Sequence, residues 1–402
     1  MLERLRALPG ARPVFEALTG EGVHVVGGAV RDTLLGREPR ELDFVVEGDA
    51  VALAARVGRE LGGEVKAHER FGTAQVTTNE LSFDVATSRR ETYPRPGALP
   101  RVQLGATLAE DLKRRDFTIN AGAVSLTDGK LRAHPLALPD LSDHLVRVLH
   151  DESFRDDPTR LLRLCRYAVR CDSDIENKTR SLVQEAVVAG ALRTVSGDRV
   201  GRELRFLLAE EQPDALGLFA ALGLGRAAVH PAFALDSGLV ARVCRLCPGD
   251  ARSDLALLAS CLLDAYSGDV RDRLRDLAFD ARAAATVVAV RERAPVLARE
   301  IAGLLEASPS DRWRRLQGET AETIAVAAAL SADPGAEMVA REWFGGHAGP
   351  ELEIDGTDLL AAGLRGADIG RGLRAATVAV LDGRAAGRAE QLAAALGIFK
   401  AS

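Results

Sequence analysis

The sequence predicts an α+β protein in which a small mixed β-sheet with helices comes first and only helices follow. Short runs rich in β-branched residues, such as 23–26 and 42–46, alternate with helical segments in the N-terminal part. From residue 213 onward, helical segments are separated by short Gly or Pro breaks, and no strand pattern of any length occurs. Aromatic residues make up only 4% of the 402 residues, so the core must consist mainly of Ala, Leu and Val, which favours closely packed helices.

Composition sets limits on the class of protein. A hydrophobic content of 47% and a charged content of 27% are ordinary for globular proteins, and the length suffices for roughly two to four compact units. The net charge of −6 does not indicate a nucleic-acid partner, so RNA contacts would have to come from local basic patches. No run approaches the length of a membrane span and the first residues lack a signal-peptide core, so we expect a cytoplasmic protein without a membrane partner.

The five cysteines do not indicate a disulfide framework, because their number is odd and their spacing irregular. Cys244 and Cys247 have the spacing of half a zinc site, but no second pair and no histidine couple lies near them. We therefore expect two helix-facing thiols there.

A strand, a diglycine turn and a helix come first. Residues 23–26 predict the strand, Gly27 and Gly28 end it, and residues 29–35 predict the helix. Glycine lets backbone N–H groups approach phosphate oxygens closely, and the helix N-terminus adds partial positive charge. Diglycine alone is more often a simple tight turn, so the functional interpretation depends on the residues of the next strand.

Two carboxylates accompany the second predicted strand, residues 42–46. Glu41 and Asp43 are two residues apart, so along a strand they project from the same face and can offer two carboxylates to one metal site. A diglycine turn followed closely by a carboxylate pair favours a phosphate and metal site over a plain turn.

The next segments predict the rest of the sheet. Asp84 lies between apolar neighbours on a predicted strand, where a carboxylate is costly unless it pairs or binds a cation. The alternative is a strand-end aspartate that caps a turn. Residues 88–101, rich in Pro and Arg, predict a mobile loop without regular structure. We expect a helix over residues 50–61 and strands over residues 64–66, 73–77 and 81–86.

Two helical segments carry clusters of arginine. Residues 108–115 predict a helix that ends in consecutive basic residues, which alone would indicate a solvated helix end. After acidic strands, however, Arg114 and Arg115 are plausible clamps on triphosphate oxygens, which arginine binds in bidentate fashion. Asp157 before Pro158 predicts a helix N-cap followed by proline in the first turn.

On the helix after this cap, one face carries arginines and one tyrosine, and the opposite face is apolar. A solvated basic face is the plain interpretation. Four arginines without acidic partners one turn away repel one another by a few tenths of a kcal/mol per pair, which a bound anion would relieve. The residues of this face are Arg160, Arg163, Arg166, Tyr167 and Arg170.

Further helices are expected beyond this point. Residues 195–210 predict an amphipathic helix, and Pro295 predicts a break between helices at 281–293 and 296–305.

Three segments together resemble motifs of the class II tRNA nucleotidyltransferase (CCA-adding) and poly(A) polymerase family: GGAVRDTLLGREPRELDFVVEGDA, DVATSRRETYPRPGALP and KRRDFTINA. The resemblance is strong over residues 23–170 and loose beyond. It implies a nucleotidyltransferase head over 1–139, a helical neck that recognises the base over 140–210, a helical body over 211–345 and a helical tail that binds tRNA over 346–402.

The chain departs from the family pattern at three places. Glu41 stands where the family usually has the first aspartate of an Asp-x-Asp pair, and Asp156 stands where an acidic pair usually begins with glutamate. Residues 131–141 lack the Gly-Gly turn and aspartate of many members, so we expect a remodelled junction between head and neck with no clear effect on chemistry.

The resemblance implies addition of CCA to the 3′ end of tRNA, without a nucleic-acid template, from CTP and ATP with release of pyrophosphate. Glu41, Asp43 and Asp84 would be the catalytic residues and would hold two Mg²⁺ ions. Asp157 and Arg160 would read the base. The other expected nucleotide contacts are Gly27, Gly28, Arg31, Arg115, Asp116, Asn120, Arg163 and Arg166.

The partner implied is tRNA, held at its acceptor stem and elbow, and the protein would be a monomer or a homodimer. Alternatives remain: a member that adds only A or only CC, a poly(A) polymerase, or an inert RNA-binding homologue. Glu41 keeps the last one open, because one extra methylene can displace a metal by about 1 Å and cost ~10²-fold in rate.

Overall fold

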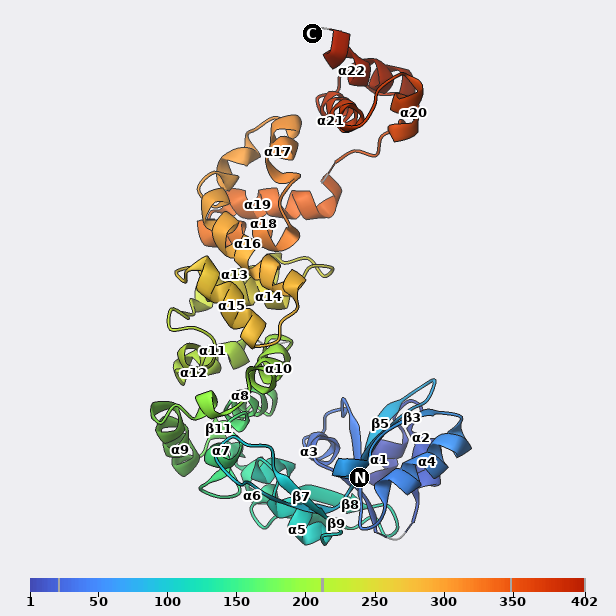
Figure 1. Cartoon of the computed structure of the whole chain (residues 1–402), viewed down its shortest axis with the longest axis vertical. Helices are drawn as coiled ribbons and strands as arrows, with labels where there is room; N and C mark the ends of the chain where they lie inside the picture. Colours follow the sequence, from blue (N-terminus) through green and yellow to red (C-terminus); the bar gives the residue numbers. More distant parts are fainter. Residues whose placement is uncertain (21, 211–212, 348, 401–402) are drawn as a thin grey trace. The chain divides into compact units, whose positions relative to one another are not determined.

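The computed structural model describes all residues except 21, 211, 212, 348, 401 and 402. The chain divides into two compact units, Met1–Ala228 and Val229–Ser402 (Figure 1). The expected boundary between neck and body falls at residues 211 and 212, which lie outside the described residues, as do residues 348, 401 and 402 of the expected tail. The α+β prediction is confirmed, because one mixed sheet lies in the first unit and the described residues of the second unit are helical or irregular.

The first unit is built on a seven-stranded sheet with the strand order β3-β4-β5-β2-β1-β8-β9. Its strands pair antiparallel, except that β2 and β5 are parallel. The strands 23–26 and 42–46 are confirmed, and β8 and β9 are additional to those we predicted. The strands are β1 (Val23–Val26), β2 (Leu42–Val46), β3 (Glu64–His68), β4 (Thr73–Thr77), β5 (Ser82–Thr87), β8 (Gly122–Ser125) and β9 (Leu131–Ala133).

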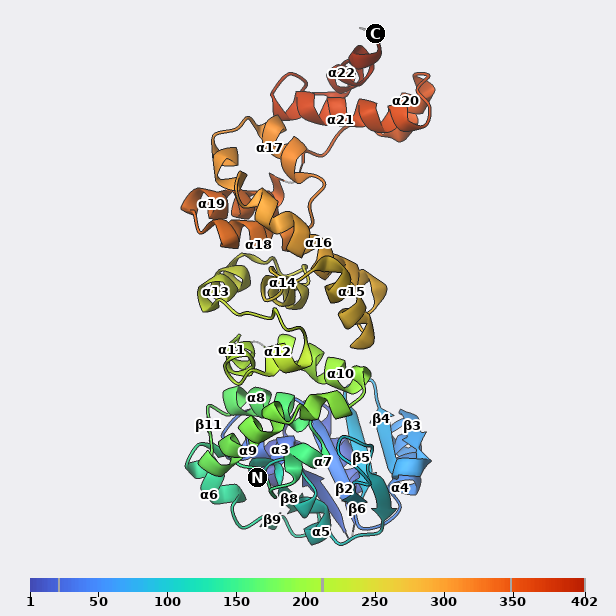
Figure 2. The ribbon, with the colours of Figure 1, turned by 60° about the vertical axis from the view of Figure 1, so that its left-hand side comes forward.

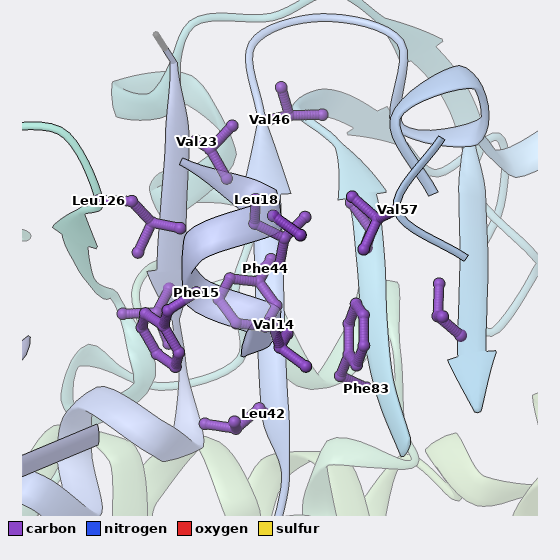
Figure 3. Close-up of a cluster of buried hydrophobic side chains, with 14 of the residues drawn as sticks. Val14, Phe15, Leu18, Val23, Leu42, Phe44, Val46, Val57, Phe83 and Leu126 are labelled. Carbon is purple, nitrogen blue, oxygen red and sulfur yellow. The ribbon is translucent and has the colours of Figure 1, made fainter. Parts of the chain in front are cut away.

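One face of this sheet carries the main core of the unit. Helices α1 (Leu2–Arg6), α2 (Ala11–Leu18) and α4 (Ala50–Leu61) contribute to this core with apolar side chains of alternate strand positions. Phe44 lies at its centre, edge-to-face with Phe15 and Phe83 at ring-centroid distances of 5.4 and 5.8 Å (Figure 3). This rigid layer fixes the strands that carry the polar residues of the other face.

The opposite face packs against α5 (Leu108–Lys113). Val26 and Val45 lie on this side with Leu108 and Leu112 of the helix, because side chains alternate along each strand. A capping box at Thr107 begins α5, which explains where this helix starts. Helix α3 (Gly28–Leu34) follows β1 directly, as predicted.

The prediction of an irregular loop over residues 88–101 is wrong at its N-terminal end and at its last residue. Residues Arg89–Thr92 form β6, which pairs antiparallel with β7 (Arg101–Leu104). The buried Asp111 carboxylate accepts the backbone N–H of Arg89, and Glu91 forms ion pairs with Arg89 and Arg114. These contacts from distant residues order a segment whose composition alone favours a loop.

The first unit ends in helices (Figure 1). The expected N-cap at Asp157 is wrong: α8 begins at Arg160 with Thr159 as its N-cap, and the Asp157 carboxylate accepts the backbone N–H of Thr159 before the helix starts. A short parallel pair joins β10 (Leu145–Val146) and β11 (Asp174–Ile175). The helices are α6 (Ala137–Ser142), α7 (Ser153–Asp156), α8 (Arg160–Arg170), α9 (Asn177–Val188), α10 (Gly197–Leu208), α11 (Asp214–Ala221) and α12 (Leu224–Ala228), with short 3₁₀ turns η1 (Glu69–Phe71), η2 (Thr118–Asn120) and η3 (Ala191–Thr194).

The second unit is helical in its described part (Figure 2). Helix α18 lies at the centre of the unit, and its residues 324–329 are completely buried. Helices α20 to α22 share a separate small core of apolar residues. The elements are α13 (Ser237–Leu246), α14 (Ser253–Ser260), α15 (Ser267–Asp276), α16 (Ala281–Leu297), η4 (Ile301–Leu305), α17 (Pro309–Leu316), α18 (Ala321–Ser331), α19 (Pro334–Glu342), η5 (Trp343–His347), α20 (Gly356–Ala361), α21 (Ala367–Leu381) and α22 (Arg388–Lys400).

The expected break at Pro295 is wrong, because α16 continues through it to Leu297. A proline removes one backbone donor and disturbs the preceding turn. Pro295 lies so near the end of the helix that only its last turn bears this cost. None of the helices in the described part of the chain combines the length and apolar character that crossing a lipid bilayer requires.

Candidate active site

Two of the predicted catalytic carboxylates lie side by side on neighbouring strands. Asp43 of β2 and Asp84 of β5 are register partners in the parallel pair, and Glu41 directly precedes β2. Burial, together with the charges of Asp84 and Glu41, raises the pKa of Asp43 to about 6. Burial and Glu41 also raise the pKa of Asp84, although a hydrogen bond from Gln75 opposes this. The structure therefore places Asp43 beside Asp84, with Glu41 near enough for its charge to raise the pKa of both.

These acids repel one another, and a bound cation would relieve this repulsion. Arg115 and Arg163 lower the pKa of Asp43, but less than its burial and acidic neighbours raise it. Within the described part of the chain, no group of three or more His, Cys, Asp or Glu side chains has a geometry that could hold a metal ion. Asp43 and Asp84 alone supply two oxygen ligands, and this donor set fits Mg²⁺, which keeps several waters and needs few protein ligands.

A cavity of about 340 Å³ lies beside Asp43. Its lining combines the diglycine turn, one acid of the pair and the arginines after α5 and on α8. The lining residues are Gly27, Gly28, Asp43, Arg89, Glu91, Tyr93, Arg114, Arg115, Asp116, Asn120, Asp157, Arg160, Arg163 and Tyr167. Arg89, Glu91 and Tyr93 were missed by sequence reasoning, because they lie in a segment interpreted as a loop, whereas Arg114 was predicted together with Arg115.

The diglycine turn and Arg115 form one wall of the cavity. Gly27 has a positive φ of +65°, and a Cβ atom there would lie 3.0 Å from Nη1 of Arg115. Arg115 pairs with Asp111 at 3.1 Å, while its buried Nε has no hydrogen-bond partner among the residues described. A donor left unused beside a glycine turn suits the oxygens of a phosphate group.

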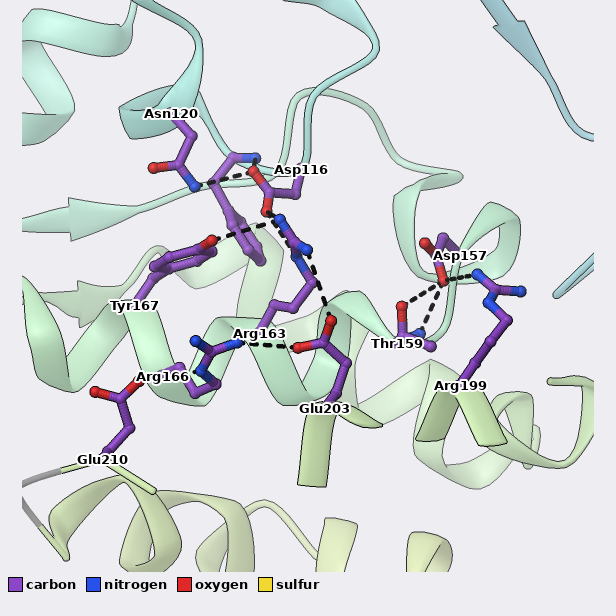
Figure 4. A network of polar contacts seen from close by, with 11 residues as sticks. Asp116, Asn120, Asp157, Thr159, Arg163, Arg166, Tyr167, Arg199, Glu203 and Glu210 are labelled. Atoms are coloured by element: carbon purple, nitrogen blue, oxygen red, sulfur yellow. Dashed lines mark hydrogen bonds and ion pairs between the residues drawn. The ribbon is translucent and has the colours of Figure 1, made fainter. Parts of the chain in front are cut away.

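Asp116 connects this wall to α8. It is buried and accepts hydrogen bonds from Asn120 at 3.0 Å and from Arg163 at 2.9 and 2.6 Å (Figure 4). Burial would raise the pKa of Asp116, but Arg163 and Asn120 outweigh it and lower this pKa to about 2. Asp116 and Asn120 thus hold the cavity wall in place.

The arginine face of α8 has no acidic partner one turn away along the helix, but acids from other parts of the chain pair with three of its arginines. Glu203 of α10 contacts Arg163 at 3.7 Å and Arg166 at 3.1 Å (Figure 4). Glu210 pairs with Arg166 at 3.1 Å and with Arg170. These acids lie far along the sequence from α8, so helical spacing could not reveal them. Relief of repulsion is therefore no argument for an anionic ligand here.

The proposed base-reading residues are held separately. Asp157 accepts from Arg199 of α10 at 2.7 Å and from the Thr159 hydroxyl at 2.6 Å (Figure 4). Arg160 is buried and donates to the hydroxyl of Ser153 at 2.7 Å and to the backbone carbonyl of Arg114 at 3.0 Å. The two residues both line the cavity, and the backbone N–H of Arg160 donates to the backbone carbonyl of Asp157 at 3.1 Å. Sequence reasoning missed Arg199, for which only its amphipathic helix gave a signal.

Arg31 lies outside the lining. It is almost completely buried, donates to Asn120 at 2.7 Å and to Asp32 at 2.8 Å, and its guanidinium lies over the ring of Tyr167 at 5.0 Å. Arg166 is not among the lining residues either. Their predicted contacts with the nucleotide stay predictions, and the structure gives both a role in joining elements.

Comparison with protein families finds a match for the part of the chain that contains most of this site. The family of the poly(A) polymerase head domain matches residues 23–147, which contain the carboxylates and the diglycine turn. The A-adding tRNA nucleotidyltransferase of Aquifex aeolicus is 46% identical over 192 residues, covering 47% of this chain and 23% of that protein. The A-adding tRNA nucleotidyltransferase of Halalkalibacterium halodurans is 43% identical over 195 residues, covering 47% of this chain and 45% of that protein.

A solved structure extends the similarity beyond the head. The Thermotoga maritima CCA-adding enzyme complexed with tRNA_CCA matches 96% of this chain and 94% of its own, with a TM-score of 0.75 and 28% identity. Residues 23–147 of the chain thus match the poly(A) polymerase head domain, and nearly the whole chain has a fold similar to that of a CCA-adding enzyme. In sequence, the chain spans about a quarter to a half of the length of the two curated relatives.

Members of the nucleotidyltransferase family generally need divalent metal ions. In this chain, the half-buried Asp43 and its register partner Asp84 are the side chains whose chemistry meets that need. The thiols of Cys244 and Cys247 are free, and Cys244 lies within α13 with Cys247 as its C-cap.

Proposed function

We propose that the chain adds nucleotides to the 3′ end of tRNA. The 3′-hydroxyl of the RNA would attack the α-phosphate of a bound nucleoside triphosphate, and pyrophosphate would leave. The observation that carries this proposal is the pairing of Asp43 opposite Asp84 beside a cavity that Gly27, Gly28 and Arg115 also line. The similarity to named tRNA nucleotidyltransferases supports it.

Each part of the cavity has a proposed role. Asp43 and Asp84, with Glu41 beside them, would hold Mg²⁺, which when bound lowers the pKa of the attacking hydroxyl and offsets the charge of the leaving group. Arg115 would donate its unused Nε–H to a phosphate oxygen, with Gly27 giving the close approach. These residues orient the triphosphate so that its α-phosphorus faces the acids.

Base selection is proposed for the other end of the cavity. The Asp157 carboxylate would accept from the exocyclic amino group of cytosine or adenine, which uracil lacks. Arg160 would donate to the same edge, with Arg163 and Arg166 behind it. Both Asp157 and Arg160 line the cavity, which supports this assignment.

The domain roles are proposed as the sequence predicts them: catalytic head over 1–139, base-recognising neck over 140–210, body over 211–345 and tRNA-binding tail over 346–402. The partners would be ATP, CTP and the acceptor stem and elbow of tRNA. The T. maritima relative is described in complex with tRNA, which supports this choice. A cytoplasmic location and a monomer or homodimer stay predictions.

The sequence predicts addition of the full CCA. A member that adds only A is the second candidate, because the two curated relatives at 46% and 43% identity are both named A-adding. Incubation of the purified protein with tRNA lacking one, two or three 3′ nucleotides, with labelled ATP or CTP, separates the candidates. Full activity requires CTP incorporation on the shortest tRNA, and an A-only member labels only tRNA that ends in CC. Addition of long runs of adenylate residues would indicate a poly(A) polymerase. No incorporation on any substrate would contradict the proposal.

A further inference from the structure

A second cavity, of about 350 Å³, lies in the first unit between α5 and the strand β9 with its following turn. None of the residues assigned a catalytic or base-reading role lines it. Its walls combine apolar side chains of α5 with basic and ring-bearing residues, including Leu108, Leu112, Lys113, Arg132, His134 and Pro135. A cavity of this size with an apolar floor and a few polar groups is typical of a binding site.

The positive charges of this cavity are unpaired. Among the residues that the structure describes, the side chains of Lys113 and Arg132 take part in no hydrogen bond or ion pair, and both residues are exposed. This contrasts with Arg163, Arg166 and Arg170 of α8, which are paired with acids. The acid that lines the cavity, Glu47, is engaged elsewhere: Oε1 accepts the backbone N–H of Leu108 at 2.8 Å, and Oε2 lies 3.8 Å from the buried His24. The free charge of the cavity is therefore positive.

The cavity adjoins the active site. Lys113 is the last residue of α5, and the next two residues, Arg114 and Arg115, line the active-site cavity. The sheet register gives the separation between Arg132 and Asp43. These two residues lie in one row across four strands, in the order Arg132, Ala123, Val26 and Asp43. Three interstrand spacings of about 4.8 Å amount to roughly 14 Å. At about 3.4 Å per stacked nucleotide, this distance corresponds to roughly four nucleotides.

We propose that this cavity binds the single-stranded 3′ segment of the RNA substrate, a few nucleotides before the reacting hydroxyl. Lys113 and Arg132 contact its phosphates, while His134 and Pro135 form a surface against which a base packs. The His134 ring is fixed for this purpose, because its Nδ1 accepts the backbone N–H of Leu136 at 3.2 Å. The inference rests on the proposed function, since it assigns part of the RNA substrate to a site beside the reaction.

The test uses the full-length double variant Lys113→Ala/Arg132→Ala. Fluorescence anisotropy without nucleotide measures the Kd for labelled tRNA that keeps its unpaired 3′ nucleotides and for the same tRNA trimmed to its paired stem. We expect the variant to bind the tRNA with unpaired 3′ nucleotides more weakly and the trimmed tRNA as the parent does. For the tRNA with unpaired 3′ nucleotides, the slope of log Kd against log salt concentration should fall by about 0.7 for each lost phosphate contact. In single-turnover reactions, the RNA concentration at half-maximal rate rises and the KM for ATP stays unchanged.

Two controls separate this site from general effects. Lys130→Ala removes a cation of the same hairpin that pairs with Asp128 at 3.4 Å and does not line the cavity, so it should behave as the parent. Lys113→Arg/Arg132→Lys keeps both charges and should restore binding. Thermal unfolding midpoints of all variants show whether any loss comes from unfolding.

Three outcomes would overturn the inference. Unchanged affinity for both RNAs means that the cavity does not contact the substrate. An equal loss for the trimmed RNA places the two cations on the duplex stem, and a raised KM for ATP alone makes the cavity a nucleotide site. Because anisotropy needs no turnover, a parent protein that binds RNA but never extends it contradicts the proposed function while leaving this site testable.

Discussion

The Arg163 guanidinium donates from both Nε and Nη2 to one oxygen of Asp116, at 2.9 and 2.6 Å. This pair joins α8 to the segment after α5, and both residues line the active-site cavity. Since Asp116 is buried, its ionised form depends on the pair, and removing either partner would leave a buried charge or an unsatisfied donor.

The pair predicts an acid dependence of stability. The pKa of Asp116 is lowered to about 2 in the folded chain from an ordinary value of 3.8. The carboxylate therefore adds stability above about pH 4, on the order of 2 kcal/mol, and this is lost as the pH falls toward 2. Asp116→Asn should be less stable than the parent at pH 7, and the difference should shrink below pH 4. Chemical denaturation at pH 7, 5, 4 and 3 measures it.

A matched control for this experiment is Asp151→Asn. Asp151 is exposed and pairs with the exposed Lys178, so its replacement should change stability little at any pH. A parent–Asp116→Asn difference that stays constant from pH 7 to pH 3 would mean that the Asp116 carboxylate is not what the pair stabilises.

The facing acids predict a strict requirement for catalysis. Asp43→Ala and Asp84→Ala should each reduce labelled-nucleotide incorporation by at least about 10²-fold, because the metal loses a ligand beside the reacting phosphate. Glu41→Ala should remove most activity, and Glu41→Asp should keep or raise it. Circular dichroism checks that the fold is retained. Parental activity of Glu41→Ala would remove this residue from the metal site.

The hydrogen bond from Arg199 to Asp157 leads us to expect different roles for the two residues in base selection. Asp157→Ala should relax discrimination against UTP more than it lowers the rate with ATP, since a wrong base edge otherwise leaves a buried charge unpaired at ~1–3 kcal/mol. Arg199→Ala should relax discrimination less, because Arg199 acts by holding the Asp157 carboxylate. Single-turnover incorporation of all four triphosphates gives the ratios.

The double variant decides whether the two residues act together. If Arg199 works only through Asp157, Asp157→Ala/Arg199→Ala should match Asp157→Ala in its ATP/UTP ratio. Additive effects would give Arg199 a separate contact, and unchanged ratios for Asp157→Ala and Arg160→Ala would move base selection elsewhere.

Because helices α20 to α22 have an apolar core of their own, we expect that their removal affects RNA binding without affecting nucleotide binding. They share their own apolar core of Ile354, Leu359, Ala376 and Ala395. Deletion of residues 346–402 should weaken tRNA binding much more than ATP binding, because the proposed active site lies in the first unit. Binding of both ligands to the shortened chain is the measurement, and equal losses would indicate general unfolding.

Much of the fold follows from local pattern. The strands 23–26 and 42–46 lie as the β-branched runs predict, because these residues suit a buried, pleated surface. β8 was not predicted, since its four small residues carry little local signal and depend on pairing with β1. The hairpin of β6 and β7 was missed for a related reason, because the ion pairs that order it come from α5 and the residue after it.

The candidate site divides in the same way. Asp43 and Asp84 could be found because a carboxylate within an apolar strand is conspicuous in a sequence. The partners of the α8 arginines could not, since Glu203 and Glu210 belong to a segment that reaches α8 only in the folded chain. Arg199 was hidden for the same reason.

The sheet order has a consequence for the synthesis of the protein. β1 pairs with β2 on one side and with β8 on the other, so a ribosome must deliver about 100 further residues before β1 has both neighbours. The acids that hold Arg163 and Arg166 come later still, on α10 and just after it. A nascent chain ending before Glu203 already carries the catalytic acids but not the anchor of the arginines opposite them. Contacts so distant in sequence slow folding, and they delay a complete site until the whole first unit has emerged.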